Sequence, residues 1–339
     1  MPWYRHLLWP FAILYGLGVW FRNRLFDYRI LPTRKFEVPV ICIGNLETGG
    51  TGKSPMVNYV VDLLLRSDFK VAVLSRGYGR RTNGFVEVNS DSKSKEVGDE
   101  PLQCKRRFPN ATVVVCENRV KGIETLLKLP FPPTVILMDD GFQHRWVTPS
   151  LSLLVTSASF SFNKNHLLPV GSLRESSAEA KRANAVIYTG IDNEAQLGTS
   201  EHGSMFETKT VSGKLVQFHG QNLDSDKING CLLFSGIANP DRFRISAKEK
   251  LNVVGHTVFP DHHHFTVSDL ESLRKKLDSF GTSANALVTT EKDAVRLIGS
   301  SVLNELEQIP MFYLPIETQF LGNQAERFDK MMLDHAKHA

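Results

Sequence analysis

The segment Gly44-Asn45-Leu46-Glu47-Thr48-Gly49-Gly50-Thr51-Gly52-Lys53-Ser54 decides the fold of this 339-residue chain. It follows a short apolar run, Val38 to Ile43, and precedes an amphipathic stretch, Pro55 to Arg66. A strand, a glycine-rich turn and a helix in this order are the context that a phosphate-binding loop requires. The glycines let backbone N–H groups face phosphate oxygens, and the start of the helix adds positive potential. The segment therefore predicts a nucleotide site.

The end of this loop carries the two side chains that a nucleoside triphosphate needs. We expect Lys53 to bridge the terminal phosphates and the Ser54 hydroxyl to reach Mg²⁺. The strict loop pattern has glycine where this chain has Glu47, and Gly49 with Gly50 can supply the flexibility instead. A chance Gly-Lys-Ser in a loop is the alternative, which the flanking strand and helix disfavour. The expected ATP contacts are Glu47, Thr48, Gly49, Gly50, Thr51, Gly52, Lys53 and Ser54.

A second apolar run ends in two acidic residues. Val135 to Met138 reads as a buried strand, and Asp139 and Asp140 follow it directly. Carboxylates at the carboxyl edge of such a sheet are where Mg²⁺ and its water shell lie in nucleotide-binding proteins. The acids before Gly141 could also be simple turn residues. Beside a phosphate loop we prefer the metal site.

Strand and helix patterns alternate through the rest of the chain. A parallel sheet covered by helices on both faces is therefore expected. The length suggests two domains, which we assign to residues 26–225 and 226–339, with the last helix packing back on the first. Alternation around Ser212 and Gly213 predicts a β-hairpin near residues 205–219 that joins them. The predicted class is a P-loop NTPase-like α/β fold with a second, smaller α/β domain.

The N-terminal residues 1–25 form a candidate membrane-contacting helix. Leu7 to Phe21 is apolar throughout, but it is shorter than the roughly 20 residues that span a bilayer. Aromatic residues suited to headgroup depth are frequent in it, and basic residues flank it. An ordinary buried helix is the alternative. The aromatic and basic residues concerned are Trp3, Tyr4, Trp9, Tyr15, Trp20, Arg5, Arg22 and Arg24.

Composition excludes several classes of protein. A formal net charge of +4 is mildly basic, and no aromatic-rich basic repeat supports nucleic-acid binding. The four cysteines form no Cys-x-x-Cys pair, which argues against a zinc site or a disulfide framework. No obligate protein partner is implied by these features.

Seven motifs in order resemble the tetraacyldisaccharide 4'-kinase family, from the lipid A pathway of Gram-negative bacteria. They are Gly-Gly-Thr-Gly-Lys-Ser-Pro (49–55), Ser-Arg-Gly-Tyr-Gly-Arg (75–80), Val-Gly-Asp-Glu-Pro (97–101), Asp-Asp-Gly-Phe-Gln-His-Arg (139–145), Leu-Leu-Pro-x-Gly-x-Leu-Arg-Glu (167–175), Phe-Pro-Asp-His-His (259–263) and Thr-Thr-Glu-Lys-Asp-Ala (289–294). The resemblance implies Mg-ATP as donor and the 4'-hydroxyl of a tetraacylated glucosamine disaccharide 1-phosphate as acceptor. It also implies a peripheral, monotopic enzyme on the cytoplasmic face of the bacterial inner membrane, whose product is the 1,4'-bisphosphorylated lipid A precursor.

The resemblance also suggests roles for an acid and a histidine. Asp99 of Gly-Asp-Glu-Pro is similar to the family's catalytic base, although an acid before Pro101 is also a routine helix start. His262 is its expected partner, with His263 second, if the two domains face each other across a cleft. A zinc site or a solvated turn are the alternatives for this histidine run.

The remaining candidates concern the acceptor and the metal. We expect Arg76, Tyr78 and Arg80 to hold the acceptor's anionic 1-phosphate, with a solvated basic loop as the alternative. We expect Gln143, His144 and Arg145 to face the transferring phosphate or the sugar. Glu175 is a third candidate metal ligand after Asp139 and Asp140. Thr290, Glu291 and Lys292 could contact the nucleotide or cap a helix, and the sequence does not decide between these. A membrane-associated regulatory or transport NTPase is the rival function, which would hydrolyse nucleotide without an acceptor.

Overall fold

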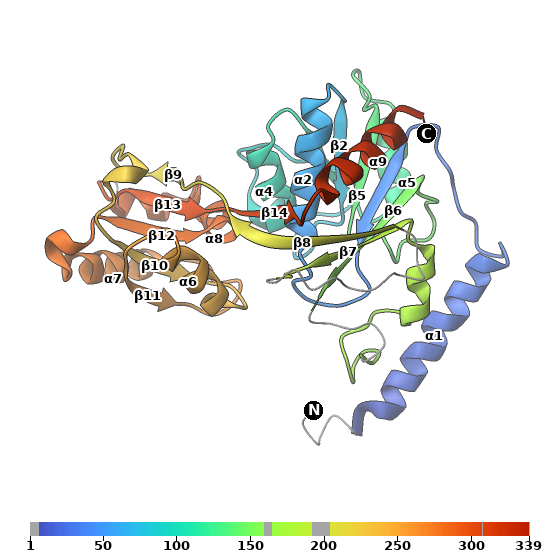
Figure 1. Cartoon of the computed structure of the whole chain (residues 1–339), viewed down its shortest axis with the longest axis horizontal. Helices are drawn as coiled ribbons and strands as arrows, with labels where there is room; N and C mark the ends of the chain where they lie inside the picture. Colours follow the sequence, from blue (N-terminus) through green and yellow to red (C-terminus); the bar gives the residue numbers. More distant parts are fainter. Residues whose placement is uncertain (1–6, 159–164, 192–203, 307, 339) are drawn as a thin grey trace.

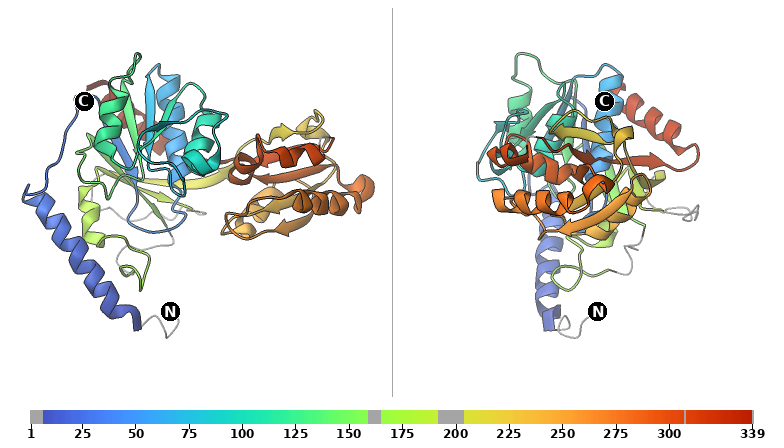
Figure 2. Two further views of the ribbon diagram at one scale, coloured as in Figure 1. Left: turned by 180° about the vertical axis from the view of Figure 1, so that it is seen from behind. Right: turned by 90° about the vertical axis from the view of Figure 1, so that its left-hand side faces the viewer.

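The computed structural model describes residues 7–158, 165–191, 204–306 and 308–338, which form two sheets with flanking helices (Figure 1). Trp3, Tyr4 and Arg5 of the predicted N-terminal helix lie outside the described residues. Helix α1 (Trp9–Asp27) extends away from the body that carries the larger sheet (Figure 2). The smaller sheet lies beside the larger one, so the chain is elongated.

The larger sheet has nine strands in the order β14-β8-β7-β6-β1-β5-β2-β4-β3. It is parallel from β8 to β4, and the edge strands β14 and β3 run antiparallel to their neighbours. The predicted central strands are therefore confirmed. The strands are β1 (Val40–Gly44), β2 (Val71–Ser75), β3 (Val86–Glu87), β4 (Thr112–Val115), β5 (Val135–Asp139), β6 (Leu151–Ser157), β7 (Ala185–Thr189), β8 (Ser204–Ser212) and β14 (Ile316–Phe320).

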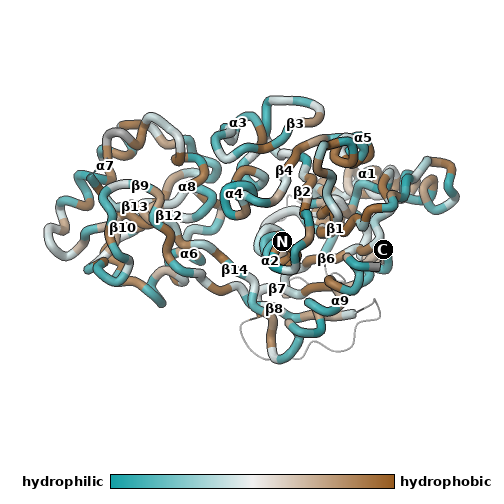
Figure 3. Tube along the Cα trace, turned by 90° about the horizontal axis from the view of Figure 1, so that it is seen from above, coloured by the Kyte–Doolittle hydropathy of each residue, from teal (hydrophilic) through white to brown (hydrophobic). Residues whose placement is uncertain are grey.

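Helices cover both faces of this sheet, which explains why its central strands are apolar on both sides (Figure 3). One face packs against α2 (Lys53–Arg66), α3 (Ser94–Val97), α4 (Asp99–Arg107) and α9 (Gln324–His338). The other packs against α5 (Arg119–Leu126) and the 3₁₀ helix η3 (Ser177–Arg182). Phe328 and Met332 of α9 are fully buried, and Tyr59 of α2 donates a 2.8 Å hydrogen bond to Asp329. The last helix thus packs on the larger sheet, as Figure 1 shows.

The smaller sheet has the order β11-β10-β12-β13-β9 and is parallel except for β9. Its strands are β9 (Val216–His219), β10 (Cys231–Ser235), β11 (Val253–Val258), β12 (Ala286–Thr290) and β13 (Met311–Leu314). Helix α7 (Val267–Asp278) and the 3₁₀ helix η6 (Ser301–Leu306) pack on one face, and α6 (Pro240–Lys248) on the other. Helix α8 (Glu291–Leu297) follows β12, and the short 3₁₀ helices η4 (Ser225–Lys227) and η5 (Gly281–Ser283) complete this part.

The predicted hairpin near residues 205–219 is wrong. Strand β8 pairs with β7 and β14 in the larger sheet, whereas β9 pairs with β13 in the smaller one. The chain therefore crosses between the sheets after Ser212 and returns near Pro315, whose carbonyl accepts a 2.9 Å hydrogen bond from Gly213. Alternation predicted the two strands, but it could not reveal that β8 and β9 belong to different sheets.

The two sheets also meet through α4 and α8. Arg106 of α4 donates to the carbonyl oxygens of Val295 at 2.7 Å and Ile298 at 3.2 Å. Arg107 pairs with Glu291 of α8 at 3.4 Å and with Glu317 of β14 at 3.1 Å. This contact brings the start of α4 next to the smaller sheet.

Helix α1 is held by one face only. Phe26 is buried against Trp146, and the Tyr15 hydroxyl donates to the carbonyl of Arg174 at 2.9 Å. Its other faces expose large apolar side chains, which are Trp9, Phe11, Ile13, Leu14, Leu17, Trp20 and Phe21, and Leu7 just before the helix is exposed as well. In the part of the chain that the structure describes, no helix combines the length and apolar character needed to cross a membrane.

Candidate active site

The phosphate loop lies between β1 and α2, as the sequence predicts. Gly49 and Gly52 have φ angles of +111° and +86°, which side chains rarely adopt, so the loop conformation requires glycine at these positions. The loop is braced from inside: Asn45 donates to the Thr51 hydroxyl at 2.9 Å, and Thr189 donates to the Thr51 carbonyl at 2.7 Å. The start of α2 therefore points its free N–H groups into the loop.

The Glu47 side chain is buried rather than turned to the phosphate position. Thr156 donates to it at 3.4 Å, and its backbone pairs with Leu173. Burial raises the pKa of Glu47, and the Thr156 bond partly opposes that rise. Only the backbone of Glu47 is therefore in a position to serve a nucleotide.

Lys53 and Asp140 lie together at the carboxyl edge of the sheet. The Lys53 ammonium is 3.4 Å from Asp140, and one Arg174 nitrogen lies 3.0 Å from both Asp140 oxygens. Burial raises the pKa of Asp140, but Lys53 and Arg174 outweigh it and hold that pKa below its ordinary value. Asp140 therefore stays ionised between two cations.

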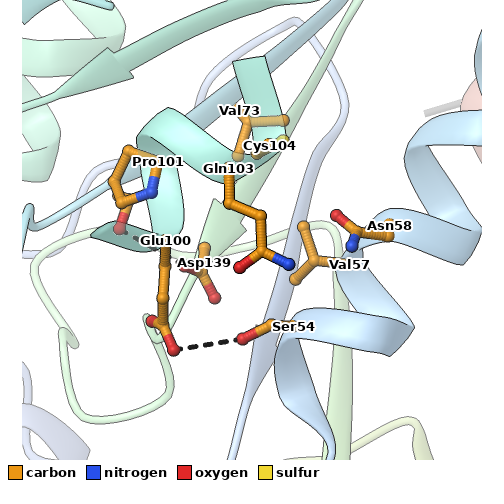
Figure 4. A pocket seen from close by; sticks show the side chains of 10 residues that line it. Ser54, Val57, Asn58, Val73, Glu100, Pro101, Gln103, Cys104 and Asp139 are labelled. Carbon is orange, nitrogen blue, oxygen red and sulfur yellow. Dashed lines mark hydrogen bonds between the residues drawn. The ribbon is translucent and has the colours of Figure 1, made fainter. Parts of the chain in front are cut away.

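Ser54 and Asp139 face one small pocket between α2 and α4 (Figure 4). The Ser54 hydroxyl donates to Glu100 at 3.1 Å, and Lys292 of α8 reaches the same Glu100 oxygen at 3.1 Å. Burial raises the pKa of Glu100, but the nearby lysines, Lys292 foremost, lower it overall. Glu100 thus connects the phosphate loop to the smaller sheet.

Asp139 is a buried acid at the carboxyl edge of the sheet. Ser75 donates to it at 3.3 Å. Burial, with Glu100 and Asp140 nearby, raises the pKa of Asp139 to about 7. The cations of the protein therefore do not fully neutralise the carboxylates around Asp139. A bound metal cation would reduce this excess of negative charge.

Asp99 begins α4, and side chains from the smaller sheet contact it. Arg296 of α8 donates to the Asp99 Oδ2 from Nε at 2.9 Å and from Nη2 at 2.7 Å. The Nδ1 of His262 lies 3.5 Å from the same oxygen, and Ser94 donates to Oδ1. Burial raises the pKa of Asp99, but Arg296 and Ser94 lower it overall. His263 instead pairs with Asp269 at 2.9 Å, so His262 is the histidine that faces Asp99.

Several predicted acceptor residues have structural partners. The Arg80 side chain, 3% exposed, forms hydrogen bonds with Thr82, the Gly84 carbonyl and Glu117, so the prediction of Arg80 as a free anion ligand is wrong. These acceptors satisfy the two terminal nitrogens of the buried guanidinium, whereas its Nε has no hydrogen-bond partner among the described residues.

Arg145 and Gln143 are also held by their surroundings. Arg145 donates to the Asn23 carbonyl at 2.9 Å and to Asp27 at 2.8 Å, which fastens α1. Gln143 donates to the Asn45 carbonyl at 2.8 Å and so supports the phosphate loop. In this structure both side chains support neighbouring elements, α1 and the phosphate loop.

The structure contradicts the prediction that Glu175 binds the metal. Its carboxylate is buried and pairs with Arg22 of α1 at 2.7 Å and with Arg182. Burial raises the pKa of Glu175, and Arg182 and Arg22 oppose that rise. These partners occupy both oxygens, so Glu175 links α1 to the body.

The surroundings of Arg76, Tyr78 and His144 are compatible with contacts to the acceptor substrate. Arg76 is exposed at the end of β2, and Tyr78 is 85% exposed. His144 lies beside Trp146, and burial, with Arg119 and Arg76 nearby, lowers its pKa to about 4. These residues follow two neighbouring strands of the larger sheet.

The structure resolves the undecided segment 290–292. Thr290 caps α8 by accepting from the N–H of Asp293 at 3.2 Å. Glu291 pairs with Arg107, whereas Lys292 reaches Glu100 beside the phosphate loop. One segment therefore contains a helix cap, an inter-sheet ion pair and a cation at the site.

Sequence reasoning gave no site role to Glu100, Arg174 or Arg296. The first two lie inside the motifs 97–101 and 167–175, so their position in a motif was the available signal. Arg296 has no such signal, because it is one basic residue on an amphipathic helix. Its partner Asp99 is 197 residues earlier in the chain.

Comparisons with known proteins agree along the whole chain. The profile of the family described as Tetraacyldisaccharide-1-P 4'-kinase matches residues 4–337. A "Tetraacyldisaccharide 4'-kinase" of Flavobacterium psychrophilum is 38% identical over 99% of this chain and 98% of that protein. One of Parabacteroides distasonis is 35% identical over 98% of this chain and 95% of its own length. A crystal structure of the "apo" form of LpxK from Aquifex aeolicus in complex with ATP has 30% identity and a TM-score of 0.79, covering 98% of this chain and 99% of that one.

Proposed function

The chain belongs to the tetraacyldisaccharide-1-P 4'-kinase family, and we propose that its phosphoryl transfer takes place between the phosphate loop and Asp99. It is an ATP-dependent kinase that phosphorylates the 4' position in lipid A biosynthesis. The acceptor is the tetraacylated glucosamine disaccharide 1-phosphate, and the product is the 1,4'-bisphosphorylated precursor. The observation that carries the site proposal is that Asp99 precedes Glu100, whose carboxylate contacts Ser54 of the loop.

ATP binds with its phosphates over the loop. The backbone of residues 47–52 and the start of α2 supply N–H donors, and Lys53 pairs with the terminal phosphates. Its present partner Asp140 is 3.4 Å away, so the ammonium is already aimed at the carboxyl edge of the sheet. Lys292, reaching the site from α8, is a second cation for the polyphosphate.

The donor set around Ser54 suits Mg²⁺. Ser54 and Asp139 are hard oxygen donors lining one pocket, with Asp140 next to them. Burial, Glu100 and Asp140 raise the pKa of Asp139 more than Lys53 and Arg119 lower it. Within the described ranges no group of three or more His, Cys, Asp or Glu side chains could hold a metal ion alone. This suits Mg²⁺, which keeps several waters and uses few protein ligands beside phosphate oxygens. Ser54, Asp139 and Asp140 would hold it, and it would neutralise charge on the β- and γ-phosphates.

Asp99 accepts the proton of the acceptor hydroxyl. The hydroxyl oxygen forms a bond to the γ-phosphorus while the bond to the β–γ bridging oxygen breaks, and ADP leaves with that electron pair. Arg296 and Ser94 keep the pKa of Asp99 low, so it is a weak base. This suits a loose transition state, in which positioning and charge neutralisation matter more than base strength. His262 adjoins Asp99, with its Nδ1 3.5 Å from the carboxylate.

The acceptor approaches from the side of Arg76, Tyr78 and His144. A guanidinium at Arg76 can pair with the anionic 1-phosphate. Support comes from the exposure of Arg76 and Tyr78 at the end of β2, on the same edge of the sheet as Asp139. Arg80, Gln143 and Arg145 act indirectly by fixing the loops around them.

Helix α1 brings the enzyme to the cytoplasmic face of the inner membrane as a peripheral, monotopic protein. Its exposed apolar side chains include Phe11, Leu14 and Leu17 at 62%, 67% and 56% exposure, and burying such side chains in a lipid surface contributes to binding. The test is sedimentation with anionic vesicles. Leu14→Ser with Leu17→Ser should reduce binding, whereas Ile245→Ser, equally exposed on α6, should not. Equal binding by all three proteins would contradict the role of α1.

The experiment for the chemistry is transfer of labelled phosphate from ATP to tetraacyldisaccharide 1-phosphate in detergent micelles. Asp99→Ala should lose transfer by about 10²-fold or more while still binding ATP. Asp91→Ala, an exposed acid before α3, is the matched control and should be unchanged. Unaltered transfer in Asp99→Ala would remove Asp99 as the base. Release of labelled inorganic phosphate without acceptor would instead favour the membrane NTPase.

A further inference from the structure

Arg296 occupies the centre of the contact between the two sheets at the site. Its side chain is only 4% exposed although it comes from a seven-residue helix, α8. Two of its nitrogens donate to Asp99 Oδ2, at 2.9 and 2.7 Å. The Nη2 atom also lies 3.1 Å from His262 Nδ1. One guanidinium therefore contacts both members of the pair proposed to act on the acceptor proton.

The geometry shows that Asp99 and His262 are joined through Arg296 more closely than to each other. The direct distance from His262 Nδ1 to Asp99 Oδ2 is 3.5 Å, longer than each contact with Arg296. A guanidinium has donors and no acceptors, so Nδ1 of the imidazole must accept this hydrogen bond. In the neutral ring the proton is then on Nε2, and Arg296 sets the tautomer of His262.

The third nitrogen of the Arg296 guanidinium, Nη1, forms hydrogen bonds with groups other than Asp99 and His262. Its Nη1 donates to Asp293 Oδ1 at 2.9 Å and to the Gly236 carbonyl at 3.1 Å. Asp293 is fully buried and is fixed in turn by the Gly236 N–H at 3.0 Å and the Thr290 hydroxyl at 2.7 Å. The orientation of the guanidinium is therefore set within the smaller sheet, independently of Asp99.

We propose that Arg296 is a positioning residue of the kinase, which holds the Asp99 carboxylate and the His262 ring in one fixed arrangement across the two sheets. The inference rests on the proposed function of Asp99. Asp99 belongs to α4 and His262 to the loop after β11, so nothing in the local chain holds them together. Arg296 supplies that link with two donors on the carboxylate and one on the imidazole.

Arg106 provides a matched control for the competing explanation, that Arg296 only stabilises the contact between α4 and α8. It is also a partly buried arginine in this contact, and it donates to the carbonyls of Val295 and Ile298. Its third hydrogen bond goes from Nε to the Ser90 carbonyl at 3.0 Å. None of these three bonds involves Asp99 or His262, so the loss of Arg106 disturbs the same interface without touching the pair. A purely structural role predicts equal effects of removing either arginine.

The test measures kcat and KM in the labelled-phosphate assay for the full chain. Arg296→Ala should lower kcat by about 10²-fold, the loss typical of a misplaced catalytic group, and change KM for ATP by less than about threefold. Arg296→Lys, which keeps the charge but not the fork, should recover part of that loss. Arg106→Ala should keep kcat within about threefold of wild type. An equal loss of kcat in Arg106→Ala would overturn the positioning role.

A double-mutant cycle separates this inference from the proposed role of Asp99. If Arg296 acts through Asp99, then Arg296→Ala in an Asp99→Asn background should cause little further loss of kcat. The same fold loss in both backgrounds would show that Arg296 acts elsewhere, with Asp99 still the base. Wild-type kcat in Asp99→Asn alone would overturn the base and the positioning role together. Thermal unfolding checks that each variant folds. If Arg296→Ala does not fold, Arg296→Lys replaces it in the double-mutant cycle.

Discussion

Replacement of Gly52 by alanine tests the conformation of the phosphate loop directly. Gly52 precedes α2 with φ +86° and ψ 16°, in the left-handed region. A Cβ atom there would also lie 3.0–3.2 Å from three atoms of Thr189. Thr189 braces the loop through its 2.7 Å hydrogen bond to the Thr51 carbonyl. The substitution therefore strains the backbone and displaces a bracing side chain. Gly50 is the matched control, because it lacks a positive φ and a Cβ there would meet no atom within 4 Å.

The expected loss of stability follows from two contributions. An alanine in the left-handed region costs about 1–2 kcal/mol. Weakening one buried hydrogen bond costs about 1 kcal/mol more. Gly52→Ala should therefore lower the free energy of unfolding by roughly 2–3 kcal/mol. Gly50→Ala should leave it unchanged or raise it by up to about 0.5 kcal/mol, because alanine restricts the unfolded chain.

Urea denaturation of the nucleotide-free protein measures both variants without any contribution from ATP binding. The two variants should differ in urea midpoint at equal slope, with Gly52→Ala the less stable. ATP affinity, measured separately by calorimetry, should also fall in Gly52→Ala, because the start of α2 is displaced. Equal urea midpoints for the two variants would refute the assignment of Gly52 to a conformation that only glycine tolerates.

Three further predictions concern the packing and titration of the chain. Phe328→Ala removes a fully buried ring that contacts Phe206 and Phe320, and should cost about 3–5 kcal/mol in urea denaturation. Arg106→Ala should speed hydrogen exchange in α8, because it frees two carbonyls there; unchanged exchange would argue against this anchor. His144 has a folded pKa of about 4, below its unfolded value, so its contribution is present above pH 6.5 and is lost as the pH falls through 4. His144→Gln should therefore flatten the stability profile between pH 7 and pH 4 by about 2 kcal/mol, after allowing for the partly exposed ring.

The sequence by itself determined the parts of the molecule that depend on near neighbours. The strand before Gly44, the glycine loop and the helix from Lys53 follow from periodicity and from the backbone freedom of glycine over about 20 residues. The buried strand ending at Asp139 follows in the same way. The ordered motifs indicated the family and hence the 4'-kinase activity, which the comparisons confirm.

Only the tertiary structure decided which side chains are available for chemistry. Arg80 and Glu175 read as ligands in the sequence, yet Glu117 and Arg22 pair with them from other elements. Strand pairing likewise separated β8 from β9, because each hydrogen-bonds a strand far along the chain. Arg296 meets Asp99 across 197 residues. Charge and polarity are properties of single residues, but a buried ion must find a partner in space. The packing of helices, sheets and loops from distant parts of the chain determines that partner, and no local pattern encodes it.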